Sequence, residues 1–176
     1  MVETSRAHED IVDVLVIGGG PAGATAALYA ARAGRSCMVV DKGVASGALG
    51  MSRAIANFPG IADPVPGADL VARLRDQAAR YGATFETDRV SATSLDGETK
   101  TAYGAKGAYR GRALIVATGS MGRTAPLEGE ERLTGRGVSY CATCDGFFFR
   151  DRTVAVVGGT DEAAEEALVL SRLAQK

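Results

Sequence analysis

The chain has 176 residues, enough for one domain and the start of a second, and its 20 basic and 21 acidic side chains leave a net charge of −1. This balance excludes nucleic-acid binding through a basic surface, and no apolar run reaches the roughly 18 residues of a membrane span. Three cysteines are too few for a secreted disulfide framework, so we expect a cytoplasmic protein without a membrane or nucleic-acid partner.

The first part of the chain predicts a β-α-β unit. Residues 1–10 are polar and mixed in charge, as expected for a flexible tail. The β-branched run 11–17 predicts a buried parallel strand, and the Ala-rich segment 21–33 predicts a helix that ends at Gly34. A second strand is expected over 36–41, which completes the unit in about 30 residues.

A Gly-x-Gly-x-x-Gly pattern connects the first strand to the helix. Gly18 permits the tight turn, Gly20 lets backbone approach a pyrophosphate, and Gly23 lets the helix pack close to the strand. Asp41, at the end of the second strand, is placed to accept hydrogen bonds from ribose hydroxyls. The alternatives are a strand–helix turn without a ligand and a solvated Asp41. The pattern alone does not separate FAD from NAD.

The middle of the chain predicts a loop, a helix and a group of strands. Residues 42–67 contain Gly and three prolines and predict a loop, whereas 69–81 predicts a helix that ends at Gly82. Several strands are expected over 84–116. Their turns lie at Asp96-Gly97 and Lys106-Gly107, and a buried strand over 113–117 ends at Thr118-Gly119.

The last third combines a cysteine pair with a second strand and Gly turn. A loop over 120–137 precedes Cys141 and Cys144, which are separated by two residues. The β-branched run 153–157 predicts a strand, and a helix is expected from about Asp161. Two nucleotide-binding domains in series would produce this weak internal echo.

The run from Cys141 to Gly146, between the Thr118-Gly119 strand end and the second Gly turn, resembles low-molecular-weight thioredoxin reductases of the pyridine nucleotide-disulfide oxidoreductase family. The resemblance covers nearly all of 10–176 but only about the first half of a family member. It implies an α/β fold: a three-layer, Rossmann-like FAD-binding domain with a parallel sheet and a β-meander over 11–122. Residues 123–176 would begin a second Rossmann-like, NAD(P)H-binding domain that carries the redox-active cysteines.

The resemblance also implies two sets of cofactor-binding residues. The FAD site would be lined by Gly18, Gly20, Pro21, Ala22, Gly23, Asp41, Lys42, Gly47, Ala48, Asn57, Ala117, Thr118 and Gly119. The pyridine nucleotide would meet Gly158, Thr160, Asp161 and Glu162.

The resemblance implies a catalytic role for three residues. Cys144 would face the flavin, Cys141 would attack the partner's disulfide, and Asp145 would act as an acid and base for the thiols. Electrons would pass from NAD(P)H through FAD to the Cys141–Cys144 pair and on to a thioredoxin-like protein. The chemistry of the pair agrees, because a Cys-x-x-Cys segment can close a small, reducible disulfide.

Departures from the family pattern predict altered cofactor binding. The second turn has Thr160 and Glu162 where the family has Gly and Ser, so an acid competes with the pyrophosphate and NADPH binding is doubtful. The run Ser46-Gly47-Ala48 lacks the Gln that the family places near the flavin. A lone β-α unit leaves apolar surface uncovered, so we expect the chain to be unstable alone or to be completed by a second chain. The resemblance implies a homodimer.

Several alternatives stay open. A zinc site would have only Cys37 and His8 as further ligands, so no metal is expected, and Cys37 is expected to be a small core residue. The cysteine pair could be buried without a redox role, and Phe147 to Phe149 are expected to pack in the core. The functional alternatives are an FAD-binding fragment without NADPH turnover and a flavin enzyme that uses ferredoxin or oxidises dithiols.

Overall fold

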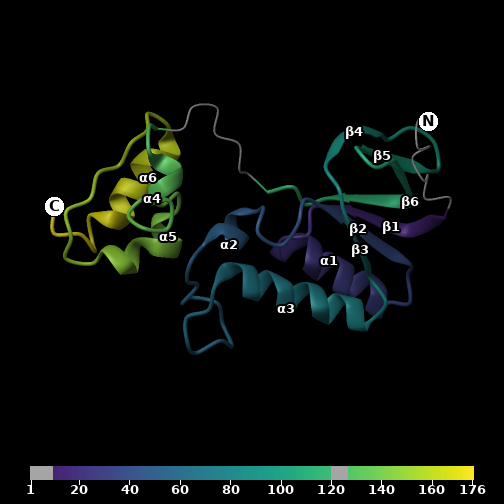
Figure 1. Ribbon diagram of the computed structural model, residues 1–176, viewed down its shortest axis with the longest axis horizontal. Helices are drawn as coiled ribbons and strands as arrows, with labels where there is room; N and C mark the ends of the chain where they lie inside the picture. Colours follow the sequence, from purple (N-terminus) through teal and green to yellow (C-terminus); the bar gives the residue numbers. More distant parts are fainter. Residues whose placement is uncertain (1–9, 120–126) are drawn as a thin grey trace. The chain divides into compact units, whose positions relative to one another are not determined.

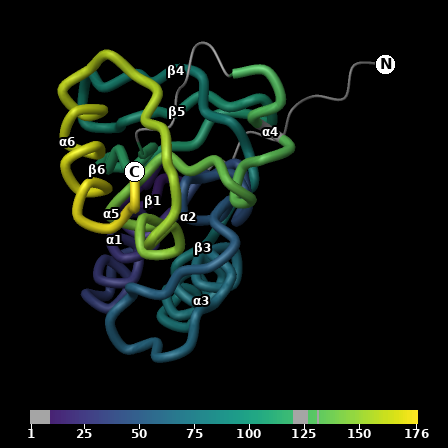
Figure 2. The backbone as a smooth tube through the Cα atoms, turned by 90° about the vertical axis from the view of Figure 1, so that its left-hand side faces the viewer, coloured from purple at the N-terminus to yellow at the C-terminus, as the bar shows by residue number. Residues whose placement is uncertain are grey.

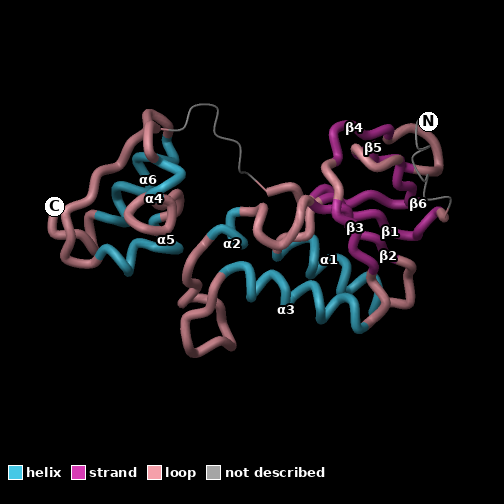
Figure 3. The backbone as a smooth tube through the Cα atoms, in the orientation of Figure 1, coloured by secondary structure: helices cyan, strands magenta, loops and turns pink. Residues whose placement is uncertain are grey.

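The computed structural model describes residues 10–119 and 127–176, which form two compact units (Figure 1). Within the described residues, the first unit comprises 10–52 and 66–119, and the second comprises 53–65 and 127–176. The first contains a sheet and its covering helices, whereas the second contains helices and loops (Figure 3).

The first unit is built on a six-stranded sheet with the order β3-β2-β1-β6-β5-β4. The four strands at the β3 side pair in parallel, and β5 pairs antiparallel with both β4 and β6. This arrangement confirms the predicted parallel sheet with a β-meander. The strands are β1 (Ile11–Ile17), β2 (Cys37–Asp41), β3 (Thr84–Thr87), β4 (Val90–Ser94), β5 (Lys100–Gly104) and β6 (Ala108–Val116).

Two long helices cover one face of this sheet (Figures 1 and 3). Helix α1 (Pro21–Arg32) packs beside α3 (Gly67–Arg80), and the chain leaves α3 to enter the sheet as β3 (Figure 2). The predicted stops at Gly34 and Gly82 are confirmed, because both adopt positive φ, +72° and +100°. The predicted loop after β2 also contains a single helical turn, α2 (Ala48–Met51).

Both faces of the central parallel strands β1 and β2 are largely buried, which explains their nearly continuous apolar sequence. Towards the helices, Val16 and Val39 pack with Ala27, Ala31 and Ala78. On the other face, Leu15 and Val40 share a cluster with Ala102 of β5 and Tyr109 of β6, so the meander forms the third layer. Small residues on α1 and α3 allow the helices to lie close to the sheet.

The second unit consists of short helices and connecting loops. Its elements are α4 (Glu130–Leu133), α5 (Ala142–Asp145), a 3₁₀ turn η1 (Gly146–Phe149) and α6 (Asp161–Leu170). The helix predicted from Asp161 is confirmed, but the strand predicted over 153–157 is wrong for this structure. A strand exists only through ladder hydrogen bonds to a neighbour, and the described residues of this unit supply none.

Two predictions of burial are also wrong. Ile115 and Val116, at the end of β6, are 37% and 65% exposed, because no described element of the first unit covers them. Phe147 and Phe148 are 66% and 47% exposed. In the single turn of η1 the buried residue is Gly146, so the two rings lie on the exposed side. The strand predicted over 153–157 and the burial predicted for the end of β6 were both inferred from apolar sequence. That sequence does not show whether another element covers the residues.

Candidate functional site

The carboxyl ends of β1, β2 and β6 meet at one edge of the sheet. The Gly18 N–H donates to the Val40 carbonyl at 2.9 Å, and the Ala117 N–H donates to the Ile17 carbonyl at 2.8 Å. This edge therefore brings together the Gly turn, Asp41 and residues 117–119, which are separate in the sequence. Ligands of open α/β sheets bind at such an edge.

The three glycines of the turn have different surroundings. A Cβ at Gly18, where φ is +99°, would lie 2.3 Å from the Ala117 carbonyl oxygen, and one at Gly23 would lie 1.8 Å from the Gly18 carbonyl oxygen. Both positions therefore have no room for a side chain. A Cβ at Gly20 would meet no atom within 4 Å, so it would project into open space. Gly18 and Gly23 serve packing, whereas Gly20 leaves space that a ligand could fill.

The N-terminus of α1 is suited to an anion. Among the described residues no side chain caps its Gly20 N-cap, Pro21 occupies the first turn, and that turn contains no acidic residue. The amide N–H groups of Ala22 and Gly23 therefore lie in the turn where helices leave backbone donors unsatisfied, and the helix dipole adds positive potential there. Because Gly20 has no side chain, a pyrophosphate of the kind found in FAD fits this position.

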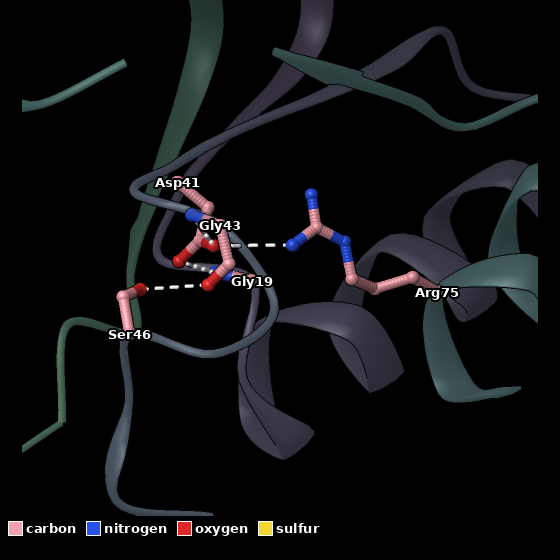
Figure 4. A network of polar contacts seen from close by, with 5 residues as sticks. All are labelled: Gly19, Asp41, Gly43, Ser46 and Arg75. Carbon is pink, nitrogen blue, oxygen red and sulfur yellow. Dashed lines mark hydrogen bonds and ion pairs between the residues drawn. The ribbon is translucent and has the colours of Figure 1, made fainter. Parts of the chain in front are cut away.

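The Asp41 carboxylate is held by three donors (Figure 4). Its Oδ2 accepts from the Gly19 N–H at 2.8 Å, and its Oδ1 accepts from the Gly43 N–H at 2.7 Å and from Arg75 at 3.1 Å. The Asp41 and Arg75 side chains are only 14% and 11% exposed. The Arg75 guanidinium also lies 4.6 Å from the centre of the Phe85 ring, which restrains it further.

This network leaves Asp41 able to accept one more hydrogen bond. A carboxylate offers about four lone-pair sites, and in the network three are used, two of them on Oδ1. The Ser46 hydroxyl supports the loop beneath by donating to the Gly43 carbonyl at 2.7 Å. Asp41 is therefore fixed in one orientation with Oδ2 beside the Gly turn.

The other residues predicted to line the flavin site lie on loops. Lys42 follows β2 and is exposed, and Gly47 and Ala48, at the start of α2, are exposed as well. Asn57 is exposed on the segment 53–65, which belongs to the second unit. None of these four is held by a contact comparable with that of Asp41 among the described residues.

Cys141 and Cys144 form a disulfide at the start of α5. The S–S distance is 2.09 Å and the Cα atoms are 5.2 Å apart. Cys144 is exposed and Cys141 is half-buried, and the Cys144 N–H donates to the Cys141 sulfur at 3.1 Å. The exposed Cys144 and the half-buried Cys141 therefore differ in their access to a reactant.

A serine connects Asp145 to this cysteine turn. The Ser139 hydroxyl donates to the Asp145 carboxylate at 2.6 Å and accepts from the Cys141 N–H at 3.2 Å. Asp145 is thus anchored directly after Cys144, where a carboxylate can exchange protons with the thiols of the reduced pair.

The second Gly turn differs from the first in its charge and its cap. The Thr160 hydroxyl oxygen caps α6 by accepting from the Ala163 N–H at 3.4 Å, and Asp161 and Glu162 occupy the first helical turn. A Cβ at Gly158 would lie 2.8 Å from the Ala163 Cβ, so this glycine serves close packing. The positive end of α6 is already used by the chain's own side chains, which makes it a poor fit for a pyrophosphate.

The third cysteine lies outside this arrangement. Cys37 is buried in β2 and is a core residue, as predicted. Burial raises the pKa of its thiol to about 11, so it is protonated near neutral pH. Over 10–119 and 127–176, no cluster of three or more His, Cys, Asp or Glu could hold a metal ion. No helix in those ranges is long and apolar enough to cross a membrane.

Comparison with known proteins shows which family combines these features. Residues 12–176 match the pyridine nucleotide-disulphide oxidoreductase family. The chain belongs to this family. Its resemblance to thioredoxin reductases, predicted from the cysteine motif, is confirmed by relatives of that name. The thioredoxin reductase of Aquifex aeolicus is 46% identical over 99% of this chain and 54% of the relative, and that of Streptomyces coelicolor is 49% identical over 94% and 52%.

Solved structures of thioredoxin reductases share the fold of this oxidoreductase chain. The Streptococcus pyogenes protein gives a TM-score of 0.84 at 38% identity, over 94% of this chain and 54% of the other. The Giardia duodenalis protein gives 0.86 at 32% identity, over 96% and 55%. The chain spans about half the length of the curated relatives it matches, and it resembles their N-terminal portion.

Four residues of this oxidoreductase touch the candidate site residues but were not predicted from sequence. Gly19, Gly43 and Arg75 hold Asp41, and Ser139 holds Asp145. In addition, Glu166 of α6 accepts a hydrogen bond from the N–H of Ala142, which lies between the two cysteines. Each partner is distant along the chain or bonds through backbone, except Ser139, which lies six residues from Asp145. A serine so close to the cysteines was visible in the sequence as a hydrogen-bonding candidate.

Proposed function

We propose that this chain carries the flavin and disulfide sites of a reductase of the thioredoxin reductase type. Electrons would pass from NAD(P)H through FAD to the Cys141–Cys144 disulfide, and then to a thioredoxin-like protein in the cytoplasm. One relative, from Mycobacterium leprae, is named a bifunctional thioredoxin reductase/thioredoxin, which supports a thioredoxin-like partner. Exposed apolar residues such as Val116 and Leu168 support completion by a second chain or a homodimer.

The observation that carries the proposal is the uncapped Gly turn beside a fixed carboxylate. The open space at Gly20 and the first-turn amides of α1 would hold the pyrophosphate, and the remaining acceptor position of Asp41 would bind a ribose hydroxyl. Bound FAD would supply the two-electron carrier between the nicotinamide and the disulfide.

The cysteine turn would perform thiol–disulfide exchange. In the reduced pair, the Cys141 thiolate attacks one sulfur of the partner's disulfide and the other partner sulfur leaves as a thiolate. Cys144 then attacks Cys141 in the mixed disulfide, re-forming the Cys141–Cys144 bond and releasing the partner as a dithiol. Asp145 would take the Cys144 proton and return it to the leaving thiolate. The partner gains two electrons from the pair and two protons, one from Cys144 through Asp145 and one from the solvent, which took up the Cys141 proton when that thiol ionised.

The flavin site is tested by adding a side chain at Gly20. Gly20→Ala should weaken FAD binding at least roughly tenfold in a fluorescence titration, because the new methyl group occupies the space proposed for the pyrophosphate. The melting temperature of the FAD-free protein should stay within about 2 °C of wild type, since that methyl group meets no protein atom.

Gly159→Ala, at an exposed glycine of the second Gly turn where an added Cβ would also meet no atom within 4 Å, is a control for the cost of replacing glycine, and its effect on FAD binding should be small compared with that of Gly20→Ala. Wild-type protein that remains colourless with added FAD would contradict the flavin assignment, and equal FAD affinity in Gly20→Ala would contradict the pyrophosphate position.

A second candidate is an FAD-holding module without NADPH turnover. The cap that Thr160 forms and the acidic first turn of α6 favour it, because both oppose an anionic ligand. NADPH-dependent reduction of a small disulfide reagent by the chain alone would exclude this candidate. Reduction by ferredoxin but not by NADPH, under anaerobic conditions, would instead support the alternative electron source.

A further inference from the structure

Helix α6 holds the cysteine turn through a partly buried hydrogen bond. The Glu166 carboxylate accepts from the N–H of Ala142, the residue that directly follows Cys141. Ala142 is 7% exposed and Glu166 is half-buried, so this contact is partly shielded from water. The partners are 24 residues apart in the chain, which makes the contact a tertiary anchor.

Helix α6 and the turn that follows it support the other end of the cysteine segment. Gly146 is buried, and a Cβ added there would lie 3.4 Å from Leu170 of α6 and 3.1 Å from Leu173 of the following turn. The Asp151 N–H donates to the Leu173 carbonyl at 3.0 Å. Both ends of the segment that contains the cysteines therefore depend on α6 and the turn after it.

The cysteine turn needs such an anchor because α5 is too short to be stable alone. It contains four residues, and a single helical turn costs more conformational entropy than its hydrogen bonds return. Closing a disulfide requires the two Cα atoms to stay near their observed separation of 5.2 Å. A contact that fixes the backbone at Ala142 raises the effective concentration of one thiol beside the other.

The charge of Glu166 acts in the same direction. A carboxylate beside the amide of residue 142 disfavours thiolate formation at the neighbouring cysteine, and thiolates occur only in the reduced pair. Backbone positioning and charge therefore both favour the disulfide over the dithiol.

We propose that Glu166 is a positioning residue that holds the Cys141–Cys144 turn and sets its thiol–disulfide equilibrium. The effect of Glu166 on catalysis rests on the proposed function, whereas its effect on the thiol–disulfide equilibrium does not. In the measured reaction, a dithiol reagent is oxidised to its own disulfide, while the Cys141–Cys144 bond takes up two electrons and two protons to give two thiols.

The equilibrium is measured by incubating the purified chain in mixtures of reduced and oxidised dithiothreitol, trapping the thiols by alkylation and weighing the products. Glu166→Gln keeps an acceptor but removes the charge, and its equilibrium should shift about threefold towards the dithiol. Glu166→Ala removes both, and its shift should be about tenfold, equivalent to about 30 mV. Glu165→Gln, an exposed neighbour on α6, should stay within about twofold of wild type.

The same titration in concentrated guanidinium separates the anchor from the chemistry of the cysteines. There the variants should all match wild type, because the contact with Ala142 requires the fold. An unchanged equilibrium in folded Glu166→Gln and Glu166→Ala would overturn the proposal, as would equal shifts for Glu165→Gln. If Glu166→Ala fails to fold, the isosteric Gln variant decides by itself.

The outcome does not depend on the flavin assignment, because dithiothreitol needs neither FAD nor NADPH. A chain that fails to bind FAD but shows the Glu166 effect would defeat the proposed function and leave this inference standing. Normal reductase activity together with an unchanged thiol–disulfide equilibrium in the Glu166 variants would support the proposed function and overturn this inference.

Discussion

At the scale of single residues, Asp41 shows how the protein fixes a carboxylate that we propose binds a ligand. Three internal donors fix its orientation and occupy two lone-pair sites on Oδ1 and one on Oδ2. A side chain fixed in this way loses little conformational entropy when a ligand binds. Arg75 contributes the only side-chain donor in this network, because the other two are backbone N–H groups.

Replacing Arg75 tests this preparation. Arg75→Met keeps the apolar stem against Phe85 but removes the charged donor, so Asp41 should lose its fixed orientation. We expect FAD binding to weaken about tenfold, in line with the loss of a charge-assisted hydrogen bond of about 1.5 kcal/mol. A fluorescence titration with FAD measures the change.

Arg73→Met on the same helix is the matched control, because the Arg73 side chain is exposed. Its FAD affinity should equal that of wild type. If Arg75→Met binds FAD as tightly as Arg73→Met does, the guanidinium has no part in preparing Asp41.

At the scale of elements, Asp88 joins the meander to the parallel strands. Its carboxylate accepts from the N–H groups of Arg89, Ala105 and Lys106 and from the Tyr109 hydroxyl, and its own N–H donates to the Asp41 carbonyl at 2.9 Å. Burial pushes the pKa of Asp88 up, but these hydrogen bonds outweigh it and hold the pKa below its usual value. The ionised side chain therefore stabilises the fold.

Asp88→Asn should lower the stability of the fold at neutral pH, and it should make that stability less sensitive to acid. Because the folded pKa of Asp88 is lowered, its contribution is complete above the unfolded pKa of about 3.9 and is lost as the pH falls through the folded value. We expect a loss of about 2 kcal/mol at pH 7, or roughly 4–8 °C in Tm. The difference from wild type should shrink as the pH falls from about 5 towards 2.

Thermal unfolding across this pH range measures both effects. Asp96→Asn, an exposed position in the β4–β5 turn, is the control and should have a Tm close to wild type at each pH. A stability difference for Asp88→Asn that stays constant from neutral to acid pH would show that ionised Asp88 does not carry the effect.

The N-terminus of α6 is the second element whose behaviour can be tested. Thr160→Gly with Glu162→Ser removes the cap and one acid, so backbone donors and positive potential become available to an anion. We expect NADPH to bind about fivefold more tightly, measured by the change in its fluorescence, while the loss of the cap costs about 1 kcal/mol of stability.

Glu128→Ser, an exposed position outside α6, controls for the change in net charge and should not alter NADPH binding. Equal NADPH affinity in the double variant and wild type would mean that the cap and the acid do not limit binding. Circular dichroism verifies that α6 remains helical in the double variant.

At the scale of the whole molecule, two compact units divide the proposed functions between them. The first holds the Gly turn and Asp41, and the second holds the disulfide, Asp145 and α6. Each unit also exposes large apolar side chains, Val116 in the first and Val157 and Leu168 in the second. The chain spans about half the length of the curated relatives it matches.

Local sequence by itself determined the parallel strands, the long helices, the Gly turn and the disulfide pair of this protein. Each of these depends on neighbours within about 30 residues: β-branched runs make β1 and β2, Gly34 and Gly82 end the helices, and two intervening residues let Cys141 reach Cys144. The same rule predicted a strand over 153–157, which fails because a strand also needs a partner that its own sequence does not contain.

Only the tertiary structure decided which residues hold the reactive groups. Arg73, Arg75 and Arg80 are equivalent as cations on one helix, yet Arg75 alone donates to Asp41, because the packing of α3 directs that side chain towards the end of β2. Glu166 reaches the amide beside Cys141 for the same reason. A hydrogen bond forms between atoms within about 3 Å, and for residues 24 or 34 positions apart that distance is set by the fold, not by sequence spacing.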